Sequence, residues 1–401
     1  MEDVPAGLGA GMKILVLGNQ GRAVSIFWSV LMRQMLAAGH TVVCCIPPGD
    51  SEADAALNAL GVRVRHYPLD RKGLHPLHDV TTFRALHAMF RQERPDFLFA
   101  STIKPVIYGC LAARLAGVPH IYATITGLGY AFEADTFFKK CVNRLCSLLY
   151  RLALSRAEGV FFQNRDDVAV FQQAGILRTD ARVLMARGTG VDTGHFALTP
   201  LPPLPPEGPI VFLLVARLLE AKGLAEYAEA ARLLKARHPQ TRVQLLGPPE
   251  HGLGSVSLET VRHWERECGL EYLGETRDVR PFVAAAHVLV LPSWREGTPT
   301  AVMEAMSMGR AAIVTDAPGC REVVEDDHNG RIVPLRDARA LAAAMTDMVE
   351  RPEQIGRMGQ AGRQMAEQLF DAQVVADGIL HQMGLGGTPA PLHPNNGEDN
   401  D

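Results

Sequence analysis

The chain begins with an alternation of strand-like and helical segments that restricts the fold more than any other feature of the sequence. Residues 12–18 form an apolar run, residues 19–22 form a turn that contains glycine, and a helical segment continues to about Ala38. A second apolar run follows at residues 41–46. Strand, turn, helix and strand in so short a segment make a βαβ unit, which requires a parallel sheet. The sequence therefore predicts an α/β fold.

The same alternation continues through the rest of the chain. Apolar runs rich in leucine and β-branched residues, without a polar residue at every second position, predict buried parallel strands. In the first half we expect strands at residues 62–66, 97–100, 120–123 and 159–163, and helices at 81–94, 106–116 and 136–153. In the second half we expect strands at residues 210–215, 243–247, 270–274, 287–291, 311–315 and 330–334, and then helices to about residue 383.

Two domains follow from the length of the chain and from one proline-rich stretch. A chain of 401 residues is longer than one ordinary core supports. Residues 199–209 are rich in proline, which is typical of a stiff linker. We expect a flexible tail at 1–11, a first domain at 12–198, a second domain from residue 210 and a disordered tail at 384–401.

The composition excludes several classes of protein. With 47% hydrophobic and 21% charged residues the chain is neither disordered nor fibrous. Its seven cysteines form no Cys-x-x-Cys pair, which argues against a disulfide framework and a zinc site. The first twelve residues lack the pattern of a signal peptide, and no apolar run is long enough to span a bilayer. We therefore expect a cytoplasmic protein.

Charge is unevenly distributed between the two halves. Residues 1–198 contain 21 Lys and Arg against 16 Asp and Glu, or +5, and residues 199–401 contain 19 against 28, or −9. A positive first half suits an anionic partner such as a phospholipid surface or a lipid diphosphate. The excess is small, so chance is the alternative explanation. It gives no indication of a nucleic acid partner.

The most informative motif follows the predicted strand at residues 287–291. Thr298 suits a helix N-cap and Pro299 suits the first helical position, because proline has no N–H to leave unpaired. The amides of Thr300 and Ala301 would then point out of the helix start, where a diphosphate can bind. Two carboxylates bracket this position, Glu296 and Glu304, and carboxylates accept hydrogen bonds from sugar hydroxyls. The alternative is that both glutamates are ordinary surface charges.

In the first half, the turns after the strands gather at one edge of the sheet, where open α/β folds bind their ligands. The first turn contains Gly18 and Gly21 but lacks the Gly-x-Gly-x-x-Gly fingerprint, which argues against a nicotinamide cofactor. Lys104 is a cation that follows directly on a strand, although it could instead cap the neighbouring helix. The turn after the strand at 120–123 contains Thr126 and Gly127.

These motifs together resemble the retaining glycosyltransferases of family 4. The resemblance covers about residues 12–383 and is carried by two glutamates separated by seven residues after a strand, followed by Ala-Met-Ser-Met-Gly-Arg and a second strand. It implies the GT-B fold, with two Rossmann-like, doubly wound parallel-sheet domains that face a deep cleft. It also implies a second domain at 210–370 and a helix at 371–383 that crosses back to the first domain.

The resemblance also assigns roles to individual residues. It implies that Glu296 faces the transferred sugar and that Glu304 binds the ribose hydroxyls of the nucleotide. Arg217 and Lys222 match the family's Arg-x4-Lys-Gly pattern and would bind the diphosphate, where negative charge builds up in the transition state. The remaining donor-site residues are Gly297, Thr298, Thr300 and Ala301 beside the diphosphate, and Thr276 and Arg277 beside the nucleobase. On the acceptor side the resemblance places Gly18, Gly21, Lys104, Thr126 and Gly127.

One departure from the family concerns the acceptor side. Many members carry a His-Gly pair where this chain has Thr126-Gly127, so the role of the histidine is either vacant or filled differently. The segments Thr-Ile-Lys-Pro and Ile-Thr-Gly-Leu-Gly-Tyr-Ala-Phe resemble a subgroup that acts on polyprenyl-diphosphate-linked sugars, which includes an N-acetylgalactosaminyltransferase. The resemblance thus implies a lipid-linked acceptor and favours a UDP-linked donor.

The predicted helix from Thr136 to Arg156 bears on where the protein acts. It combines many apolar residues with Lys139, Lys140 and Arg144 and has no acidic residue after its first turn. A basic, apolar helix of this kind can lie in a membrane interface. The alternative is a domain helix that buries one face. If the first explanation holds, the protein is associated peripherally with the inner face of the cytoplasmic membrane.

The predicted chemistry is transfer of a hexose or N-acetylhexosamine from a nucleotide sugar with retention of configuration. We expect no metal and no other cofactor, because Arg217, Lys222 and two helix amides supply the positive charge that a metal would otherwise provide. The single Asp-x-Asp sequence lies in the tail at residues 399–401. Three alternatives remain: an epimerase of the same fold, a sugar transferase or synthase with a soluble acceptor, and a catalytically inactive partner protein at the membrane.

Overall fold

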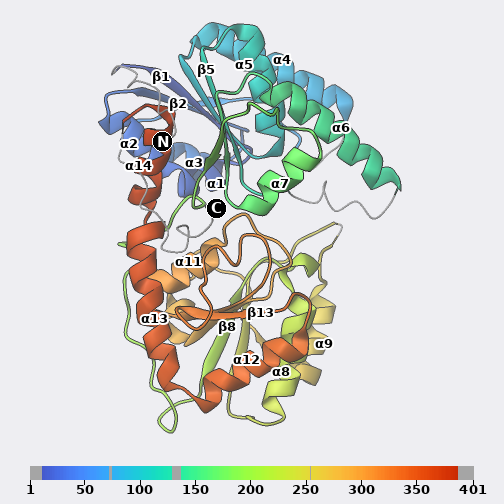
Figure 1. Cartoon of the computed structure of the whole chain (residues 1–401), viewed down its shortest axis with the longest axis vertical. Coiled ribbons are helices and arrows are strands. Elements are labelled where there is room, and N and C mark those ends of the chain that lie inside the picture. Colours follow the sequence, from blue (N-terminus) through green and yellow to red (C-terminus); the bar gives the residue numbers. More distant parts are fainter. Residues whose placement is uncertain (1–10, 72–74, 129–136, 253, 387–401) are drawn as a thin grey trace. The chain divides into compact units, whose positions relative to one another are not determined.

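The computed structural model describes residues 11–71, 75–128, 137–252 and 254–386, and of residues 137–141 it describes the backbone alone. The chain divides into two compact units (Figure 1). The first unit comprises Met1–Gly190 together with Ala372–Asp401, and the second comprises Val191–Asp371.

The first unit is built on a seven-stranded parallel sheet. Every neighbouring pair of strands is parallel, as the βαβ pattern predicts. The order is 3-2-1-4-5-6-7, so the direction of winding reverses between β1 and β4, as in doubly wound folds. Across the sheet the strands are β3 (Arg63–His66), β2 (Thr41–Ile46), β1 (Lys13–Leu17), β4 (Phe97–Ser101), β5 (His120–Ile125), β6 (Gly159–Phe162) and β7 (Val183–Met185).

Helices cover both faces of this sheet because successive strand residues point to opposite sides. In β1, Leu15 and Leu17 pack into one core, whereas Ile14 and Val16 pack into the other. The first core is closed by α4 (Pro76–Glu93), the π-helical turn η1 (Pro105–Gly109), α5 (Cys110–Ala116), α6 (Phe137–Leu154) and α7 (Arg165–Gln173). The second is closed by α1 (Gly21–Phe27), α2 (Ser29–Ala37), α3 (Ser51–Ala59) and α14 (Ala372–Met383).

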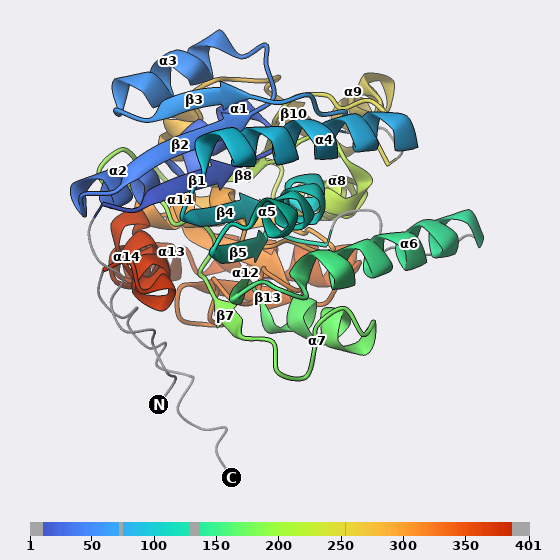
Figure 2. The same ribbon diagram turned by 90° about the horizontal axis from the view of Figure 1, so that it is seen from above.

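The last helix, α14, belongs to the first unit although it is far from it in sequence. It lies beside α2 in both ribbon views (Figures 1 and 2), and Val375, Ile379 and Met383 are buried in the core that α2 covers. Leu385, which we expected in a disordered tail, is also buried there, and its N–H donates to the carbonyl of Leu380 over 3.0 Å. The rest of the predicted tails, residues 1–10 and 387–401, lies outside the described residues.

The second unit repeats this architecture with a six-stranded parallel sheet. Its order, 10-9-8-11-12-13, again reverses its winding, here between β8 and β11. The two parallel-sheet domains of the predicted fold class are therefore confirmed. In order across the sheet the strands are β10 (Leu270–Tyr272), β9 (Arg242–Leu246), β8 (Val211–Val215), β11 (Val288–Leu291), β12 (Ala311–Thr315) and β13 (Gly330–Val333).

Two layers of helices enclose this second sheet. Phe212 and Leu214 of β8 face one layer and Leu213 faces the other. The first layer contains α8 (Leu224–Lys235), α9 (Leu258–Cys268), α12 (Ala338–Glu350) and the start of α13 (Glu353–Met365). The second contains α10 (Arg280–Ala285), α11 (Thr300–Ser307), the end of α13 and the π-helical turn η4 (Ala366–Phe370), and a short 3₁₀ turn, η3 (Glu220–Lys222), precedes α8.

The proline-rich segment is part of the second unit, in contrast to the linker that we expected at 199–209. The guanidinium of the buried Arg310 donates to the carbonyls of Thr199 and Pro200 over 3.1 and 2.9 Å, and Leu204 packs against the core of the unit. The first domain also ends earlier than the expected residue 198, because Phe196 packs on the second core. These contacts are long-range, so the local proline content could not indicate them.

The sequence interpretation missed α9, α10 and the short strand β7, and it also missed the two helices α3 and α7. Both helices have a side-chain cap, since Asp50 accepts a hydrogen bond from the amide of Ala53, and Asn164 from that of Asp167. This Asp/Asn start signal could have revealed them. The strand β7 is only three residues long, too short for a periodic pattern.

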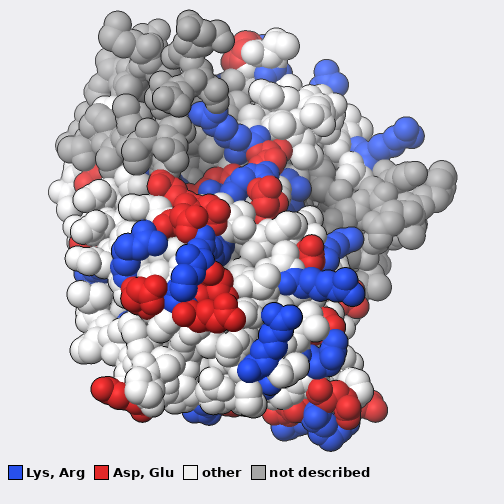
Figure 3. Space-filling model, turned by 60° about the horizontal axis from the view of Figure 1, so that its bottom comes forward, with Lys and Arg blue, Asp and Glu red and all other residues white. Residues whose placement is uncertain are grey.

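The surface shows no single-sign region on the face drawn in Figure 3, where acidic and basic side chains are interspersed. In the second unit, acidic and basic side chains also pair directly with each other. Arg331 lies 2.9 Å from Asp347 and Arg242 lies 2.6 Å from Glu271. The acidic excess of the second half is thus neutralised locally in part. Among the helices that the structure describes, none is both long and apolar enough to cross a bilayer.

Arg310→Lys should destabilise the second unit. The Arg310 guanidinium donates to the carbonyls of Thr199, Pro200, Val283, Ala284 and Met308, and a single lysine nitrogen cannot serve all of them. Since each buried carbonyl left without a donor is costly, we expect the free energy of unfolding to fall by about 3 kcal/mol. Urea unfolding followed by tryptophan fluorescence measures this.

The matched control is Arg237→Lys, at an exposed arginine of the same unit. It should change the unfolding free energy by less than about 0.5 kcal/mol. Equal stabilities of the two variants would contradict the structural role of Arg310.

Candidate donor-sugar site

The second sheet brings the predicted donor-site residues to one place through its reversal of winding. Ligands of doubly wound folds bind beyond the carboxyl ends of the strands, where the strand order reverses. In this unit that point lies between β8 and β11, which are direct neighbours. Arg217 and Lys222 follow β8, and Glu296 follows β11. Residues some eighty positions apart therefore meet, as the sequence predicts.

A glycine allows the two loops to approach closely. Gly223 has φ +69°, and a Cβ there would lie 2.0 Å from the carbonyl oxygen of Pro292, so no other residue fits. The loops are also tied by hydrogen bonds. The N–H of Trp294 donates to the carbonyl of Ala221 over 2.8 Å, and the Ser293 hydroxyl donates to the same oxygen over 3.0 Å. The position of Lys222 relative to the loop after β11 is thus fixed by backbone contacts.

Lys222 and Glu296 form an ion pair. The Nζ of Lys222 lies 2.5 Å from Oε1 of Glu296, and the two side chains are 19% and 15% exposed. The loop of Glu296 is in turn held by the loop after β12, since its N–H donates to the carbonyl of Pro318 over 2.9 Å. A sugar diphosphate that bound here would place its negative charge beside Lys222 and its hydroxyls beside Glu296.

Arg217 has a different partner. Its Nη1 lies 3.0 Å from Oε1 of Glu250, in the loop after β9, and its side chain is 54% exposed. Gly247 permits this approach, because a Cβ there would lie 1.9 Å from the carbonyl oxygen of Ala216. The sequence interpretation identified Arg217 but missed Glu250, for which no spacing rule exists. An exposed pair of this kind contributes little to stability, so a phosphate can compete for the arginine.

The start of α11 differs from the prediction by one position. Thr298 is not the N-cap, because Pro299 has an extended conformation with ψ 101° and itself precedes the first helical residue, Thr300. The hydroxyl of Thr298 is buried and has no hydrogen-bond partner among the described residues. The amides of Thr300 and Ala301 likewise have no acceptor there, as expected for the first turn of a helix. The predicted anion-binding groups are therefore present at the helix start.

Glu304 lies in the middle of α11 and is half-buried. In the described part of the chain its carboxylate makes no hydrogen bond and no ion pair, in contrast to Glu296. Burial raises its pKa to about 7. A desolvated carboxylate without a donor is a liability in the free protein. It is suited to accept hydrogen bonds from the hydroxyls of a ligand, which is the predicted role.

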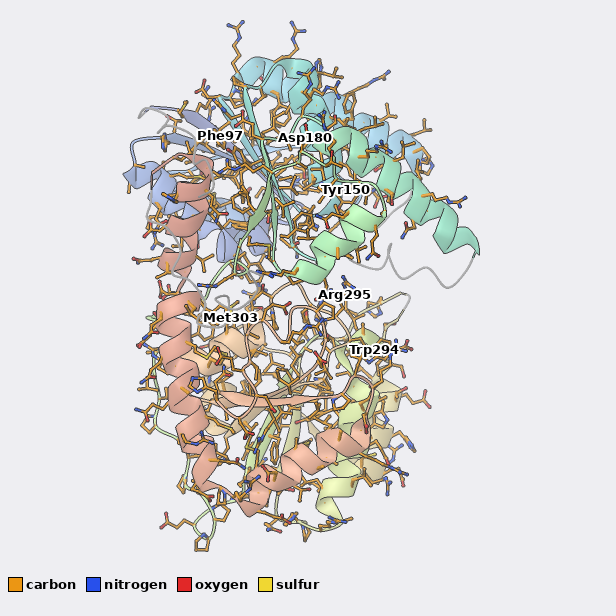
Figure 4. The ribbon with its side chains drawn as sticks, in the orientation of Figure 1. Phe97, Tyr150, Asp180, Trp294, Arg295 and Met303 are labelled. Carbon is orange, nitrogen blue, oxygen red and sulfur yellow. The ribbon has the colours of Figure 1, made fainter. Side chains whose placement is uncertain are left out.

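Trp294 is a residue of this site that the sequence interpretation did not assign. Its indole N–H donates to Oε1 of Glu226 over 3.1 Å, and the guanidinium of Arg336 lies 4.0 Å from the centre of its ring. Figure 4 shows Trp294 and Arg295 in the loops at one edge of the second sheet and Met303 in α11. The indole thus connects the loops after β11 and β13 with α8. A tryptophan directly after a predicted strand was the available signal.

The remaining donor-site candidates lie in the loop after β10. Thr276 is partly buried and its hydroxyl accepts a hydrogen bond from the N–H of Asp278 over 3.1 Å, whereas Arg277 is exposed. Gly274 accepts a bond from the N–H of Gly247 over 2.8 Å, so this loop lies beside the one after β9. Gly297 lies beside Gly319, because a Cβ on Gly319 would be 2.4 Å from the Gly297 carbonyl oxygen.

In the first unit, the turn after β1 is occupied by a carboxylate of the protein itself, that of Asp50. A carboxylate oxygen of Asp50 accepts a hydrogen bond from the N–H of Arg22 over 2.8 Å, at the start of α1. Gly21 is required by packing, since a Cβ there would lie 2.9 Å from the Cβ of Ala53. A Cβ on Gly18 would similarly meet Val24. The structure thus explains both glycines by packing, without a ligand.

Lys104 is also engaged within the protein. Its Nζ lies 2.7 Å from a carboxylate oxygen of Asp79 and 2.7 Å from the carbonyl oxygen of Asp70, and it is only 14% exposed. The ion pair with Asp79 of α4 neutralises the charge of Lys104 in the free protein, so the acceptor-side role of Lys104 remains a prediction. Thr126 is partly buried and Gly127 has φ +131°, and the residues that follow, 129–136, lie outside the described residues.

The comparisons with known proteins agree with this architecture. Residues 24–186 match the family model described as glycosyl transferase 4-like domain, and residues 202–365 match the one described as glycosyl transferases group 1. The structure of Alr3699/HepE from Anabaena in complex with UDP-glucose is similar, with a TM-score of 0.74 at 17% identity over 93% of this chain and 99% of that chain. Sucrose-phosphate synthase from Thermosynechococcus elongatus has a TM-score of 0.74 at 18% identity over 91% and 96%.

These findings define a two-domain enzyme of the GT-B fold. The chain belongs to the glycosyltransferases that combine a 4-like first domain with a group 1 second domain. Among its relatives is the N,N'-diacetylbacillosaminyl-diphospho-undecaprenol alpha-1,3-N-acetylgalactosaminyltransferase of Campylobacter jejuni, 24% identical over 92% of this chain and 97% of the relative. Another is the UDP-Gal:alpha-D-GlcNAc-diphosphoundecaprenol alpha-1,3-galactosyltransferase of Escherichia coli, 25% identical over 72% and 75%.

Glu304→Ala should weaken the binding of UDP-sugars by about 1.5–3 kcal/mol, the range for a hydrogen bond to a charged group. Because the pKa of Glu304 is about 7, wild-type affinity should also fall as the pH is lowered from 8 to 6, when the carboxylate becomes protonated. Titration calorimetry with a panel of UDP-sugars measures both effects, since their phosphates do not titrate in this range.

Glu304→Gln is the control for the pH dependence. The affinity of the Glu304→Gln variant for UDP-sugars should be low and should not change between pH 6 and 8. A raised pKa means that the wild type loses stability as the pH rises from about 4.5 to 7. The Gln variant should therefore be the more stable of the two at pH 8 and not at pH 5. Wild-type affinity in the Ala variant would identify Glu304 as an ordinary helix residue.

Proposed function

We propose that this protein is a retaining glycosyltransferase that transfers a hexose or N-acetylhexosamine from a UDP-sugar to a polyprenyl-diphosphate-linked sugar at the inner face of the cytoplasmic membrane. The observation that carries the donor half is the unpaired carboxylate of Glu304 on the helix whose first amides, those of Thr300 and Ala301, lack acceptors. Hydroxyl donors and a phosphate are the ligand groups that would satisfy both.

The reaction that this site supports needs stabilisation of the departing diphosphate. Lys222 is already held against the loop of Glu296, and Arg217 is exposed in the neighbouring turn. Both cations and the α11 amides would neutralise the charge that builds up as the glycosidic bond to the phosphate breaks. Glu296 and Glu304 would hold the sugar and the ribose. With the acceptor hydroxyl on the same face, the departing phosphate oxygen takes its proton, and the configuration is retained.

The acceptor half of the proposal is supported by the relatives and by one helix. The relatives from C. jejuni and E. coli are named for acceptors on a diphosphoundecaprenol carrier. In α6, Tyr150, Ala153 and Leu154 are buried against the first sheet. Three leucines lie on the other side and are 58, 54 and 46% exposed, namely Leu145, Leu148 and Leu152. The helix is thus apolar on two sides, which a domain helix alone does not require.

The charged residues of α6 fit an anionic surface. Arg144 and Arg151 are exposed beside the leucine stripe, and the described part of the helix contains no acidic residue. Basic side chains beside exposed leucines are the pattern of helices that lie in a membrane interface. The helix extends outward from the sheet toward its N-terminal end (Figures 1 and 2). The side chains of Lys139 and Lys140, which belong to the same hypothesis, lie outside the described residues.

The alternatives predict other properties. A transferase or synthase with a soluble acceptor has no use for an exposed leucine stripe, and an inactive partner protein would not need to keep Arg217, Lys222, Glu296 and Glu304 together. The decisive experiment is transfer from radiolabelled UDP-sugars to polyprenyl-diphosphate-linked sugars and to free sugar phosphates. Transfer to the free sugar phosphate alone would support the soluble-acceptor enzyme.

Transfer should be insensitive to chelation. Since Arg217, Lys222 and the α11 amides supply the positive charge, the rate in excess EDTA should equal the untreated rate within about twofold. Lys222→Ala should lower the rate by roughly 100-fold or more, the effect of removing one donor to a developing negative charge. Loss of activity in EDTA with recovery on adding Mg²⁺ or Mn²⁺ would disprove this account of the leaving group.

Binding to anionic liposomes should depend on α6. The wild type should sediment with vesicles that contain phosphatidylglycerol, and salt should reduce the effect because surface charge is screened within roughly 8–10 Å. Replacing Leu145, Leu148 and Leu152 with Gln should abolish sedimentation and slow transfer to the lipid-linked acceptor. Hydrolysis of the UDP-sugar should remain unchanged, because the donor-site residues belong to the second unit.

The matched control is Leu258→Gln, which replaces a leucine of the second unit that is 47% exposed. It should sediment as the wild type does. If the α6 variant still bound the vesicles, or if it lost hydrolysis and transfer to the same extent, α6 would be an ordinary domain helix.

A further inference from the structure

The first unit contains a half-buried cation, Arg187, which has no counter-ion among the described residues. Arg187 follows directly on Ala186, whose N–H extends the ladder of β6 by donating to the carbonyl of Phe162 over 2.8 Å. Arg187 therefore stands at the carboxyl edge of the first sheet, where ligands of such folds bind. Its Nη1 is buried, and no residue that the structure describes accepts a hydrogen bond from its guanidinium.

This arrangement is costly unless a ligand completes it. Burial lowers the pKa of Arg187, which reflects the loss of hydration by its charged form. The same chain shows how a structural arginine is satisfied, since Arg310 donates to five backbone carbonyls and one hydroxyl. Arg187 has no such set of acceptors. A guanidinium with a buried nitrogen and no acceptor destabilises a protein, so this arrangement points to an anion that binds from outside.

The other positively charged or hydrogen-bond-donating groups considered at this edge are either paired within the protein or exposed to water. Asp79 neutralises Lys104, and the carboxylate of Asp50 accepts a hydrogen bond from the N–H of Arg22 at the start of α1. Arg165, after β6, is exposed and so remains hydrated. Arg187 thus differs from these groups because its buried Nη1 has no hydrogen-bond acceptor among the described residues.

Two hydroxyls at the same edge are in a similar state. Thr102, directly after β4, has φ +72°, a conformation that is strained for a β-branched residue. Its hydroxyl is buried without a partner, as is that of Thr124 in the adjacent strand β5. Strained residues with unsatisfied polar atoms cluster at ligand sites. Their strands are separated from β7 by β6, and for Thr102 also by β5, so these hydroxyls indicate polar ligand groups at the same edge but farther along it.

We propose that Arg187 binds the diphosphate of the lipid-linked acceptor in the first unit. The inference rests on the proposed function and replaces Lys104 as the cation on the acceptor side. The planar guanidinium can donate two parallel hydrogen bonds to a phosphate, and a diphosphate supplies the charge that the buried cation lacks. The donor diphosphate is the other source of the same chemistry, but the residues assigned to it all belong to the second unit.

The test uses the full chain, with farnesyl diphosphate as the probe for a prenyl diphosphate, and farnesol and UDP as comparisons. Arg187→Met should weaken binding of farnesyl diphosphate at least about 10-fold, the effect of losing a charged hydrogen bond. Binding of farnesol and of UDP should not change. Arg187→Lys should be intermediate, because it keeps the charge but loses the paired hydrogen bonds. Arg91→Met, at an exposed arginine of α4, is the matched control and should bind as the wild type does.

The free energy of unfolding distinguishes a ligand-binding role of Arg187 from a structural role. Removing an unpaired buried charge should leave the ligand-free Arg187→Met variant at least as stable as the wild type in urea unfolding. Lower stability, or unchanged affinity for farnesyl diphosphate, would show a structural arginine and overturn the inference. Weaker binding of UDP would assign Arg187 to the donor instead. If the wild type bound UDP but no prenyl diphosphate, the acceptor in the proposed function would itself be wrong, and the inference would fall with it.

Discussion

The structure depends on the burial of both faces of two parallel sheets. A parallel strand hidden on both sides can present functional groups only beyond its ends, because its side chains are used for packing. In the second unit, Phe212 and Leu213 of one strand enter opposite cores. The loops at the carboxyl edge are then brought together by the strand order, which makes β8 and β11 neighbours. The donor-site residues meet as a consequence of the way the core is built.

Close backbone approach turns this edge into a defined site. Gly223 against Pro292 and Gly247 against Ala216 leave no room for a side chain, so the loops are fixed by their main chains. On this rigid base, Lys222 and Glu296 satisfy each other while Glu304 is left without a partner. In the ligand-free protein Glu304 is therefore already desolvated without a compensating hydrogen bond, so ligand binding need not remove further water from it. Hydroxyl groups of a ligand would supply the hydrogen bonds that the carboxylate of Glu304 lacks.

The two units differ in how they treat their charges. In the second unit two cations of the candidate donor site have carboxylate partners, since Arg217 pairs with Glu250 and Lys222 with Glu296. In the first unit Lys104 is neutralised by Asp79, whereas the buried Nη1 of Arg187 has no partner among the described residues. The exposed pair of Arg217 with Glu250 can be exchanged for a phosphate at little cost. An unpaired cation would instead gain a partner that it lacks, so in our proposal the two arrangements would bind anions in different ways.

The sequence by itself determined most of the strands and indicated the residues of the candidate donor site. Runs such as Thr41–Ile46 and Ala311–Thr315 are strands because uninterrupted β-branched and apolar residues leave no other buried structure of that length, and the structure has both at these bounds. Tertiary structure decided which charges are available. The pairing of Lys104 with Asp79, the exposure of Leu145 in a helix with a buried opposite face, and the isolation of Arg187 depend on side chains distant in sequence. Periodicity describes neighbours along the chain, whereas desolvation and pairing depend on neighbours in space.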